Sequence, residues 1–506
     1  GVGDLNEVHR METFDMDATN GFLDSKWYHL YCSVQRCNSA LRVLNAATDE
    51  QVNGRVSRIA EMKVLRAHYY FELSRLFNKI PYFDENVEIS QYPDIPNNEF
   101  TRDEILSMLA KEMLDAAEQL PASQPEVGRI HKYIALAYAA KIKLYQAYQQ
   151  DEITHAVTSI NKELLREVVS LCDQVTASNR YGLLDDFQGL DLVTNENGKE
   201  SVFAIQYSMN DGTESAGRIN WSNLLNSPGG GSPYGGDGFF LPSQDLINAY
   251  QTDANGLPDF NYQSKSDYSW AVLNNGVYTL QNTTPNVDPR LDFVVGRPTI
   301  TWKTYPDKPC EGWVRDKDTY GYNCAKRFWV SPESSDMFNG WPWGASQLNW
   351  QIIRYADILL WKAEALIELN EGNGLETARD LINQIRNRAR NSAYVKDFND
   401  HSKYAANYLV NPYPADVWNQ DYARQALRWE TRLEKALEGE RFFDLVRWGI
   451  VETTMNNYIT AESDNRIYYA NAHFTGGKDE YYPVPNNQYG FSGGKYVQNP
   501  GYAPFN

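Results

Sequence analysis

Apolar residues recur every three or four positions over two long blocks of the chain, a spacing that predicts amphipathic helices. The first block extends from about Asp24 to Ser178, and its helices are expected over Trp27–Ala47, Val56–Phe77, Thr101–Leu120, Ile130–Tyr148 and Lys162–Ala177. The third helix opens with Thr101-Arg102-Asp103-Glu104. This sequence is a capping box, in which the hydroxyl and the carboxylate each satisfy a free backbone N–H group.

The second block extends from about Trp350 to Trp448. Its apolar faces predict helices over Ile352–Leu366 and Leu375–Ala389, separated by a short turn at Asn370–Gly374, and a last helix over Ala423–Trp448. The eight expected helices group naturally as four helix-turn-helix pairs. Because such pairs bury their apolar faces only by stacking, we expect a tetratricopeptide-like scaffold of helical repeats.

The helical periodicity disappears between Arg180 and Asn349, where Gly, Pro, Asn, Tyr and Trp are frequent. The Gly-rich run Ser227–Gly236 is expected to be loop, and Val202–Ile205 and Phe293–Val295 read as short strands. A structureless segment of this length is unusual in a compact domain. We therefore expect a subdomain of loops, short strands and short helices, and a similar loop-rich region from Tyr468 to the end.

The expected fold class is mainly α, with a helical repeat scaffold and a large loop-rich α+β insertion. With 506 residues, the chain is long enough for two cores. We expect an N-terminal helical block over 1–179, the insertion over 180–349, a C-terminal helical block over 350–450 and a loop-rich segment over 451–506.

Charge and hydropathy exclude several kinds of partner. The 47 Lys and Arg residues against 66 Asp and Glu residues give a net charge of −19, which repels phosphate backbones, so nucleic acid is not an expected partner. No run of about 18 apolar residues is present, so we expect no membrane-spanning segment. The chain begins Gly1-Val2-Gly3 without a basic and apolar leader, so we expect that any export or anchoring segment was removed or never existed.

Metal, nucleotide and nucleophilic sites have no visible motif. The five cysteines and seven histidines lack metal-ligand spacing, and the Gly-rich run lacks the Lys-Ser/Thr of a phosphate loop. We expect no cofactor and no metal, and the spacing of the Asp-rich loops does not support calcium. Cys310 and Cys324 flank a loop and could form a disulfide in an oxidising compartment.

A cluster of charges near the end of the last helix could be read as a catalytic acid and base with cationic helpers. The charges stand at i, i+3, i+4 and i+7 and therefore share a helix face: Glu440, Arg441, Asp444 and Arg447. We interpret them as structural, pairing across helices with charges such as Arg354, Glu364 and Arg386 to define the helix register.

Many short motifs follow one another in an order that is familiar from a known family. The earlier ones are Leu65-Arg66-Ala67, Tyr69-Tyr70-Phe71, Ile80-Pro81 and Asp288-Pro289-Arg290-Leu291. The later ones are Arg354-Tyr355-Ala356-Asp357, Glu438-Gly439-Glu440-Arg441-Phe442, Tyr481-Tyr482-Pro483-Val484-Pro485 and Gln498-Asn499-Pro500-Gly501-Tyr502. Together they resemble the SusD/RagB family of outer-membrane glycan-binding lipoproteins, and the resemblance covers nearly the whole chain.

The resemblance implies a function and a location. It implies a non-catalytic receptor that captures oligosaccharide or polysaccharide on the cell surface and delivers it to a SusC-like TonB-dependent outer-membrane transporter. It also implies attachment to the outer membrane through an N-terminal lipid, whose attachment site this chain does not contain. In the family, glycan contacts differ between members, so the motifs assign no individual contact residue.

Aromatic placement suggests where a glycan would bind. Eight of the thirteen tryptophans fall between Arg180 and Trp350, and a flat indole or phenol suits the apolar face of a sugar ring. On this physical ground we expect stacking or hydrogen bonds from Trp27, Trp270, Tyr278, Trp302, Trp313, Arg315, Asp316, Tyr320, Asn323, Trp341 and Trp343. The competing interpretation is that half or more of the tryptophans form the subdomain's own core.

Two alternative functions remain open at this point. A glycoside hydrolase or lyase needs two carboxylates about 5 to 9.5 Å apart. The loop region offers Asp245, Asp253, Asp292, Asp316 and Asp318, without a reason to pair any two. The other alternative is a solenoid that holds a peptide or protein in a helical groove.

Overall fold

The computed structural model describes residues 5–213, 217–221, 231–235, 238–269, 271–274, 277–280, 285–305, 312–340 and 344–505, with backbone alone at 272–274, 277–280, 317 and 318. Its contacts group the chain into two compact units. The first unit comprises Gly1–Asn179, Phe442–Asn457 and Asn471–Asn506, and the second comprises Arg180–Arg441 and Tyr458–Ala470. The expected insertion and the first part of the expected C-terminal helical block thus share one unit.

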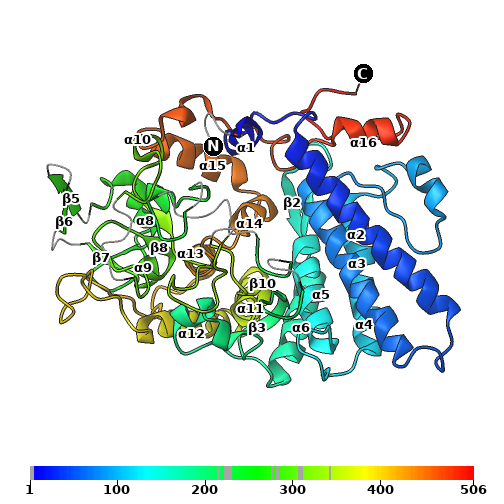
Figure 1. Ribbon diagram of the computed structural model, residues 1–506, viewed down its shortest axis with the longest axis horizontal. Coiled ribbons are helices and arrows are strands. Elements are labelled where there is room, and N and C mark those ends of the chain that lie inside the picture. Colours follow the sequence, from blue (N-terminus) through cyan, green and yellow to red (C-terminus); the bar gives the residue numbers. More distant parts are fainter. Residues whose placement is uncertain are drawn as a thin grey trace. The chain divides into compact units, whose positions relative to one another are not determined.

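The first unit is built on antiparallel helices that pack in chain order (Figure 1). Its long helices are α2 (Gly21–Ala46), α3 (Arg55–Phe77), α4 (Arg102–Gln119), α5 (Lys132–Ala147) and α6 (Lys162–Ala177). Shorter elements of this unit are α1 (Asn6–Glu12), η1 (Ile89–Asp94), β1 (Tyr148–Gln150), β2 (Val157–Ile160), α14 (Arg441–Arg447), α16 (Asn486–Phe491) and the first part of α15 (Val451–Glu462). Arg441 and the end of α15, from Tyr458, belong to the second unit. The five helices expected in this block are confirmed, and α15 was not expected.

The capping box expected at the start of α4 is confirmed. The backbone N–H of Glu104 donates to Thr101 Oγ1 at 3.3 Å, and the backbone N–H of Thr101 donates to Glu104 Oε2 at 2.8 Å. Two otherwise unpaired backbone donors at the helix start are therefore satisfied by side chains only three residues apart.

Replacing Thr101 with alanine is expected to lower the free energy of unfolding by about 1 kcal/mol, because the cap of α4 is lost. Urea denaturation followed by circular dichroism measures the effect. Ser107→Ala, an exposed change in the middle of the same helix, is the control and is expected to leave stability unchanged or slightly raised. An equal effect of the two substitutions would contradict the capping role.

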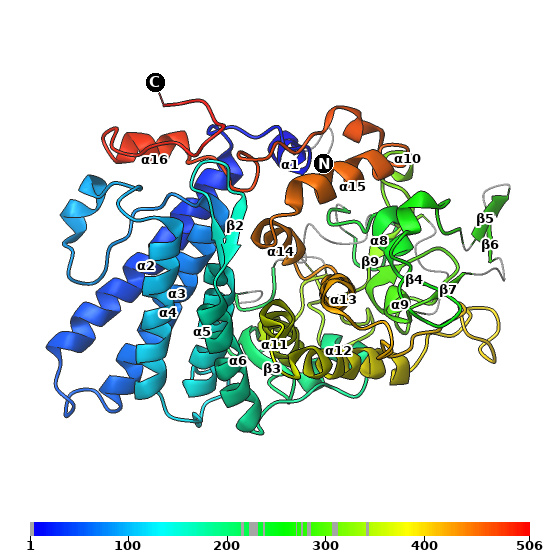
Figure 2. The same ribbon diagram turned by 180° about the vertical axis from the view of Figure 1, so that it is seen from behind.

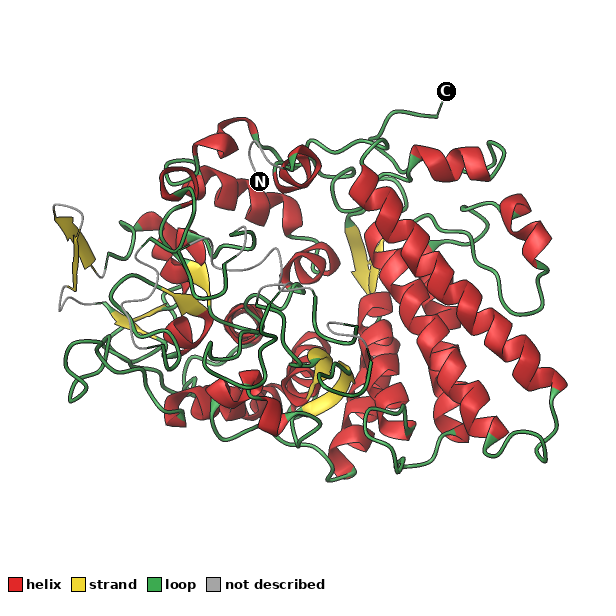
Figure 3. Cartoon of the chain, in the orientation of Figure 1, coloured by secondary structure: helices red, strands yellow, loops and turns green. Residues whose placement is uncertain are grey.

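The second unit combines three long helices with short strands and loops (Figure 3). The helices α11 (Tyr355–Leu369), α12 (Gly374–Asn391) and α13 (Gln420–Glu434) pack on one another, as Figure 2 also shows. The turn expected between the first two is confirmed, with Asn370 in the left-handed conformation at φ 52°. The mainly α, tetratricopeptide-like fold class is confirmed by this arrangement and by the helical stack of the first unit.

The remaining elements of the second unit are short. Its helical turns are η2 (Phe187–Asp191), η3 (Val193–Asn195), α8 (Gln244–Ala249), η4 (Tyr262–Ser264), α9 (Arg290–Val294), α10 (Lys317–Tyr320) and η5 (Ile467–Asn471). Its antiparallel strand pairs are β3 (Ser201–Ile205) with β10 (Trp350–Arg354), β4 (Gln251–Thr252) with β7 (Asn286–Val287), β5 (Ala271–Asn274) with β6 (Val277–Leu280), and β8 (Val295–Gly296) with β9 (Cys324–Ala325). The β3–β10 ladder joins the two ends of the loop-rich segment, with Trp350 opposite Ile205.

Two expected elements differ from the structure. The run Phe293–Val295 is not a strand but the end of helix α9 and the start of β8, because Asp288 Oδ1 accepts the N–H of Arg290 and starts a helical turn. The expected helix Ala423–Trp448 is broken into α13 and α14. Leu437 and Gly439 between them adopt left-handed φ values of 66° and 80°, which an α-helix does not allow.

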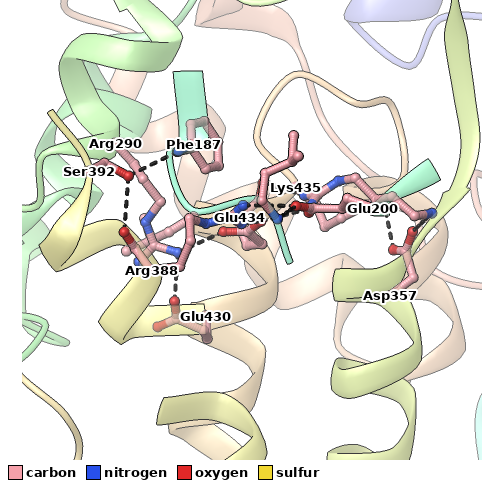
Figure 4. A network of polar contacts seen from close by, with 12 residues as sticks. Phe187, Glu200, Arg290, Asp357, Arg388, Ser392, Glu430, Glu434 and Lys435 are labelled. Atoms are coloured by element: carbon pink, nitrogen blue, oxygen red, sulfur yellow. Dashed lines mark hydrogen bonds and ion pairs between the residues drawn. The ribbon is translucent and has the colours of Figure 1, made fainter. Parts of the chain in front are cut away.

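A buried network of ion pairs joins the helices of the second unit (Figure 4). At its centre Glu434, on α13, accepts hydrogen bonds from Arg290, Arg354 and Arg388. Glu430, one helical turn earlier, pairs with Arg290 at 2.6 Å and with Arg386 at 3.0 Å. The guanidinium groups come from α9, β10 and α12, so this network sets the position of three elements against α13.

The breaking of the last helix follows from the same network. Glu438 pairs with Arg354 at 2.8 Å and with Lys435 at 2.6 Å, so the chain beyond α13 turns toward Arg354. The sequence-based interpretation that Arg354 and Arg386 are structural charges agrees with these contacts. The partners of Arg354 are Glu200, Glu434 and Glu438, rather than the expected group of charges at 440–447.

Among the described helices, none is both long and apolar enough to cross a membrane.

Candidate functional site

Several of the aromatic residues expected to bind glycan form an internal core of the second unit. Trp302 and Trp313 pack edge-to-face with ring centroids 5.7 Å apart, and Tyr234, Trp329 and Cys324 belong to the same buried cluster. The side chain of Trp302 is 0% exposed, and its Nε1 donates to the carbonyl of Ala325. Trp302 and Trp313 therefore cover each other, and the prediction that they stack on sugar is wrong for the structure as it stands.

Trp27 is also a core residue. It lies on α2 in the first unit, 2% exposed, with its ring centroid 5.0 Å from Phe77 and 5.2 Å from Tyr31. The prediction that Trp27 joins the glycan site is therefore wrong: the apolar face of α2 buries it between helices.

Four of the expected aromatic contacts have no described side chain. Trp270, Trp341 and Trp343 lie outside the described residues, and Tyr278 is described only as backbone of β6. The disulfide considered between Cys310 and Cys324 likewise stays a prediction, because Cys310 lies outside the described residues. For these residues the expectations stay predictions.

The remaining expected residues fall in one short segment. Arg315 and Asp316 are exposed, and the carbonyl of Asp316 accepts the backbone N–H of Tyr320 at 2.9 Å at the start of α10. Neither residue lines a pocket described in the second unit. Tyr320 and Asn323 do line one, and Gly321, which lies between α10 and β9, adopts a left-handed φ of 77° that glycine tolerates.

We call this cavity the Tyr320 pocket. It has a volume of about 430 Å³, which lies within the roughly 300 to 1,000 Å³ that is common for ligand sites. Five segments of the chain supply its lining: Pro242 and Gln244; Asp267, Tyr268, Ser269 and Ala271; Pro298; Tyr320, Gly321, Tyr322 and Asn323; and Glu462, Asp464, Asn465 and Arg466.

The tyrosines and the amide of the pocket suit a hydroxylated ligand. Tyr320 and Tyr322 are half-buried, and Tyr320 lies against Tyr468 with ring centroids 5.8 Å apart. The side chain of Asn323 is 8% exposed, and its Oδ1 accepts no hydrogen bond from any residue that the structure describes. Since a buried amide is normally hydrogen-bonded, the Oδ1 of Asn323 is an unsatisfied acceptor within the pocket wall, where it is itself covered by neighbouring atoms.

Two charged side chains that line the Tyr320 pocket, those of Arg466 and Glu462, form hydrogen bonds with other groups of the protein. Arg466 donates from Nη1 to the hydroxyl of Tyr468 at 3.1 Å and from Nη2 to the carbonyls of Leu241 and Pro242. Glu462 accepts the backbone N–H of Asp245 through Oε1. Burial raises the pKa of Glu462 to about 7, against the opposing influence of that N–H and of Arg466.

Sequence reasoning missed the acidic and basic residues of this pocket. Tyr322 follows Tyr320 by two positions and could have been predicted from the same clustering of aromatic residues in the loop-rich segment. Glu462, Asp464 and Arg466 were not, because they stand about 140 residues further along the chain in a segment that carries no binding motif. Their proximity to Tyr320 is a property of the tertiary structure.

The carboxylates considered for hydrolysis have other partners. Asp245 pairs with Arg432 at 2.6 Å, and Asp292 pairs with Arg297 at 2.8 Å. The side chain of Asp253 accepts backbone N–H groups of its own turn. None of these three lines the Tyr320 pocket. Asp318 has no described side chain.

Metal-binding side chains do not gather within the described parts of the chain, where no group of three or more His, Cys, Asp or Glu is placed to hold an ion.

Comparison with known proteins gives consistent matches. A family model described as "SusD family" matches residues 199–502, and one described as "Starch-binding associating with outer membrane" matches residues 4–144. A SusD-like protein of Bacteroides ovatus is 22% identical over 475 residues, which cover 88% of this chain and 70% of that protein.

Solved structures show the same fold. A SusD superfamily protein of Bacteroides vulgatus matches with a TM-score of 0.69 at 21% identity, covering 99% of this chain and 90% of that one. Surface glycan-binding protein A of Bacteroides thetaiotaomicron, in complex with laminarihexaose, matches with a TM-score of 0.61 at 20% identity over the same shares of the two chains.

Proposed function

Because the chain belongs to the SusD family, we propose that it is a non-catalytic receptor that binds oligosaccharide or polysaccharide in the Tyr320 pocket. The family expected from the sequence motifs is the one found. The observation that carries the proposal is an open cavity of about 430 Å³ that is lined by two half-buried phenol rings and by a buried amide whose Oδ1 has no described partner. Phenol rings offer a flat apolar face to a sugar, and the amide offers both a donor and an acceptor.

The location and the transporter partner are proposed on family membership. We infer that the protein is held at the outer membrane, exposed at the cell surface through an N-terminal lipid in its full-length precursor, and that it delivers glycan to a SusC-like TonB-dependent transporter. The name of the model that matches residues 4–144 supports the membrane association. Co-purification of such a transporter with the tagged, lipidated protein from native membranes is the expected result.

The binding site is tested by removing its aromatic rings. Tyr320→Ala and Tyr322→Ala are each expected to weaken binding of a glycan about three- to tenfold in calorimetry, because each loses a stacking surface. The glycan is chosen beforehand by affinity electrophoresis against a polysaccharide panel that includes laminarin and starch. Tyr320→Phe keeps the ring and is expected to retain most of the affinity.

The control for these variants is Tyr28→Ala. Tyr28 is an exposed tyrosine on α2 in the first unit, so its loss removes the same atoms without touching the Tyr320 pocket. Unchanged affinity in both pocket variants would reject this site, and the absence of binding to every polysaccharide would reject the function.

A glycoside hydrolase is the second candidate, and Glu462 is the observation that favours it. A carboxyl group with a pKa of about 7 at the wall of a pocket resembles a general acid. Glu462, however, is itself 1% exposed and holds the backbone of Asp245, a positioning contact. If the purified protein releases reducing sugar and Glu462→Gln abolishes this release, the protein is a glycoside hydrolase and the receptor function is rejected.

A further inference from the structure

The charges around the Tyr320 pocket are strongly unequal. Among its described lining residues, three carry a carboxyl group, Asp267, Glu462 and Asp464, and one carries a cation, Arg466. Burial raises the pKa of Glu462 to about 7, so the two aspartates supply most of the negative charge at neutral pH. Asp267 and Asp464 are exposed at the rim, so they present negative charge to an entering ligand. A ligand that carries an acidic group is therefore repelled from the pocket, and this repulsion is strongest where the ligand displaces water.

The single guanidinium is already engaged. Nη1 of Arg466 donates to Tyr468, Nη2 donates to two backbone carbonyls, and Nε lies 3.7 Å from Glu462 Oε2. A carboxylate or sulfate group is usually recognised by the free edge of an arginine, where two parallel N–H groups face two oxygens. In Arg466 the N–H groups of that edge already donate to oxygens of the protein, so Arg466 positions the chain and does not recognise an anion.

The amide of Asn323 favours a different ligand group. It lies in the wall of the same pocket, more than nine-tenths buried, and its carbonyl oxygen accepts no hydrogen bond from a described residue. A sugar hydroxyl donates one hydrogen bond and accepts another, whereas a carboxylate or a sulfate only accepts. An unpaired acceptor next to carboxylates is thus complementary to hydroxyl groups.

We propose, on the basis of the proposed glycan-binding function, that the Tyr320 pocket selects uncharged sugar units and discriminates against units that carry a carboxylate or a sulfate. The rim carboxylates repel an acidic sugar unit, and Arg466 supplies no compensating contact because its N–H groups are engaged by the protein. The unsatisfied Oδ1 of Asn323 favours a hydroxyl donor. The substrate class is therefore a neutral polysaccharide, and uronic and sulfated glycans bind more weakly because of their charge.

The test uses three forms of one glycan. A neutral oligosaccharide that binds, with laminarihexaose as the first probe, is oxidised at its primary hydroxyl groups to carboxylates, and part of the product is converted to the methyl ester. In calorimetry with wild-type protein the carboxylate form is expected to bind about tenfold more weakly than the methyl ester. The ester controls for size, because it has the added atoms without the charge. The difference should shrink at high salt, where exposed charges are screened.

Rim variants assign the discrimination to this pocket. Asp464→Asn is expected to improve binding of the carboxylate form about threefold and to leave binding of the neutral form within about twofold. Asp185→Asn removes a carboxylate that is 98% exposed in the same unit but does not line the pocket, and it is expected to change neither.

The outcomes separate the two proposals. If the carboxylate form binds as tightly as its methyl ester, or if Asp464→Asn and Asp185→Asn behave alike, the selection of neutral sugars is wrong while glycan binding stands. If neutral, uronic and sulfated polysaccharides all fail to bind, the proposed function is wrong and the inference is rejected with it.

Discussion

Replacing Glu434 with alanine is expected to lower the free energy of unfolding of the second unit by about 3 to 5 kcal/mol, because it leaves buried cations without a counter-ion. Glu434 is 0% exposed and accepts hydrogen bonds from Arg290, Arg354 and Arg388. Urea denaturation followed by tryptophan fluorescence measures the loss. Glu376→Ala, an exposed change on α12 in the same unit, is the control and is expected to cost less than about 0.5 kcal/mol.

The same residue gives a pH dependence with a defined sign. Burial opposes ionisation, but the guanidinium groups of Arg388, Arg354 and Arg290 prevail and lower the pKa of Glu434 to about 2, from an ordinary value of 4.5. A carboxyl whose pKa is lower in the folded state stabilises the fold above its unfolded pKa and loses that contribution as pH falls through its folded pKa. The stability difference between wild type and Glu434→Gln should therefore shrink between about pH 4.5 and pH 2. A difference that stays constant over this window would contradict the ionised state of Glu434.

Replacing Trp302 with alanine is expected to cost about 3 to 5 kcal/mol of unfolding free energy, as for other large aromatic side chains removed from a core. The indole is fully buried against Tyr234 and Trp313, and its removal leaves a cavity that these rings do not fill. Thermal denaturation measures the loss, and Trp302→Phe, which keeps part of the packing, is expected to lose less.

Glycan affinity distinguishes this core role from the stacking role that the sequence suggested. Measured well below the unfolding transition, the affinity of Trp302→Ala is expected to stay within about twofold of wild type, whereas that of Tyr320→Ala falls. Loss of binding in Trp302→Ala with unchanged stability would restore Trp302 to the ligand site and contradict its burial.

The predicted features that hold are those specified by a few neighbouring residues. The capping box at Thr101, the turn at Asn370–Gly374, the strand at Ser201–Ile205 and the apolar faces of α2 to α6 each depend on side chains within one or two helical turns. Hydrogen bonds and burial at that range follow the local order of residues, so periodicity was sufficient to find them.

The family motifs were also readable, and the structure gives one physical reason for several of them. Arg290 of the Asp288–Leu291 motif, Arg354 of the Arg354–Asp357 motif and Glu438 of the Glu438–Phe442 motif belong to the buried ion-pair network around α13. Each of these residues is paired with charges on other elements, so they contribute jointly to the position of those elements. The sequence revealed the residues without revealing their pairings.

The composition of the candidate site is where the sequence was insufficient. A loop tryptophan has the same local signature whether it packs inside a subdomain or faces a ligand, so Trp302 and Trp313 could not be distinguished from exposed rings. The break between α13 and α14 is similar, because Glu438 turns toward Arg354, 84 residues earlier in the chain.

Local order along this chain thus specifies its helices, its caps, its loop-rich segment and its family. Tertiary contacts alone decide which aromatic rings are core, where the last helix breaks, and that Tyr320 and Asn323 share a pocket with Glu462 and Arg466. The physical reason is that helix periodicity and capping act over a few residues, whereas burial and charge pairing depend on segments brought together from across a unit.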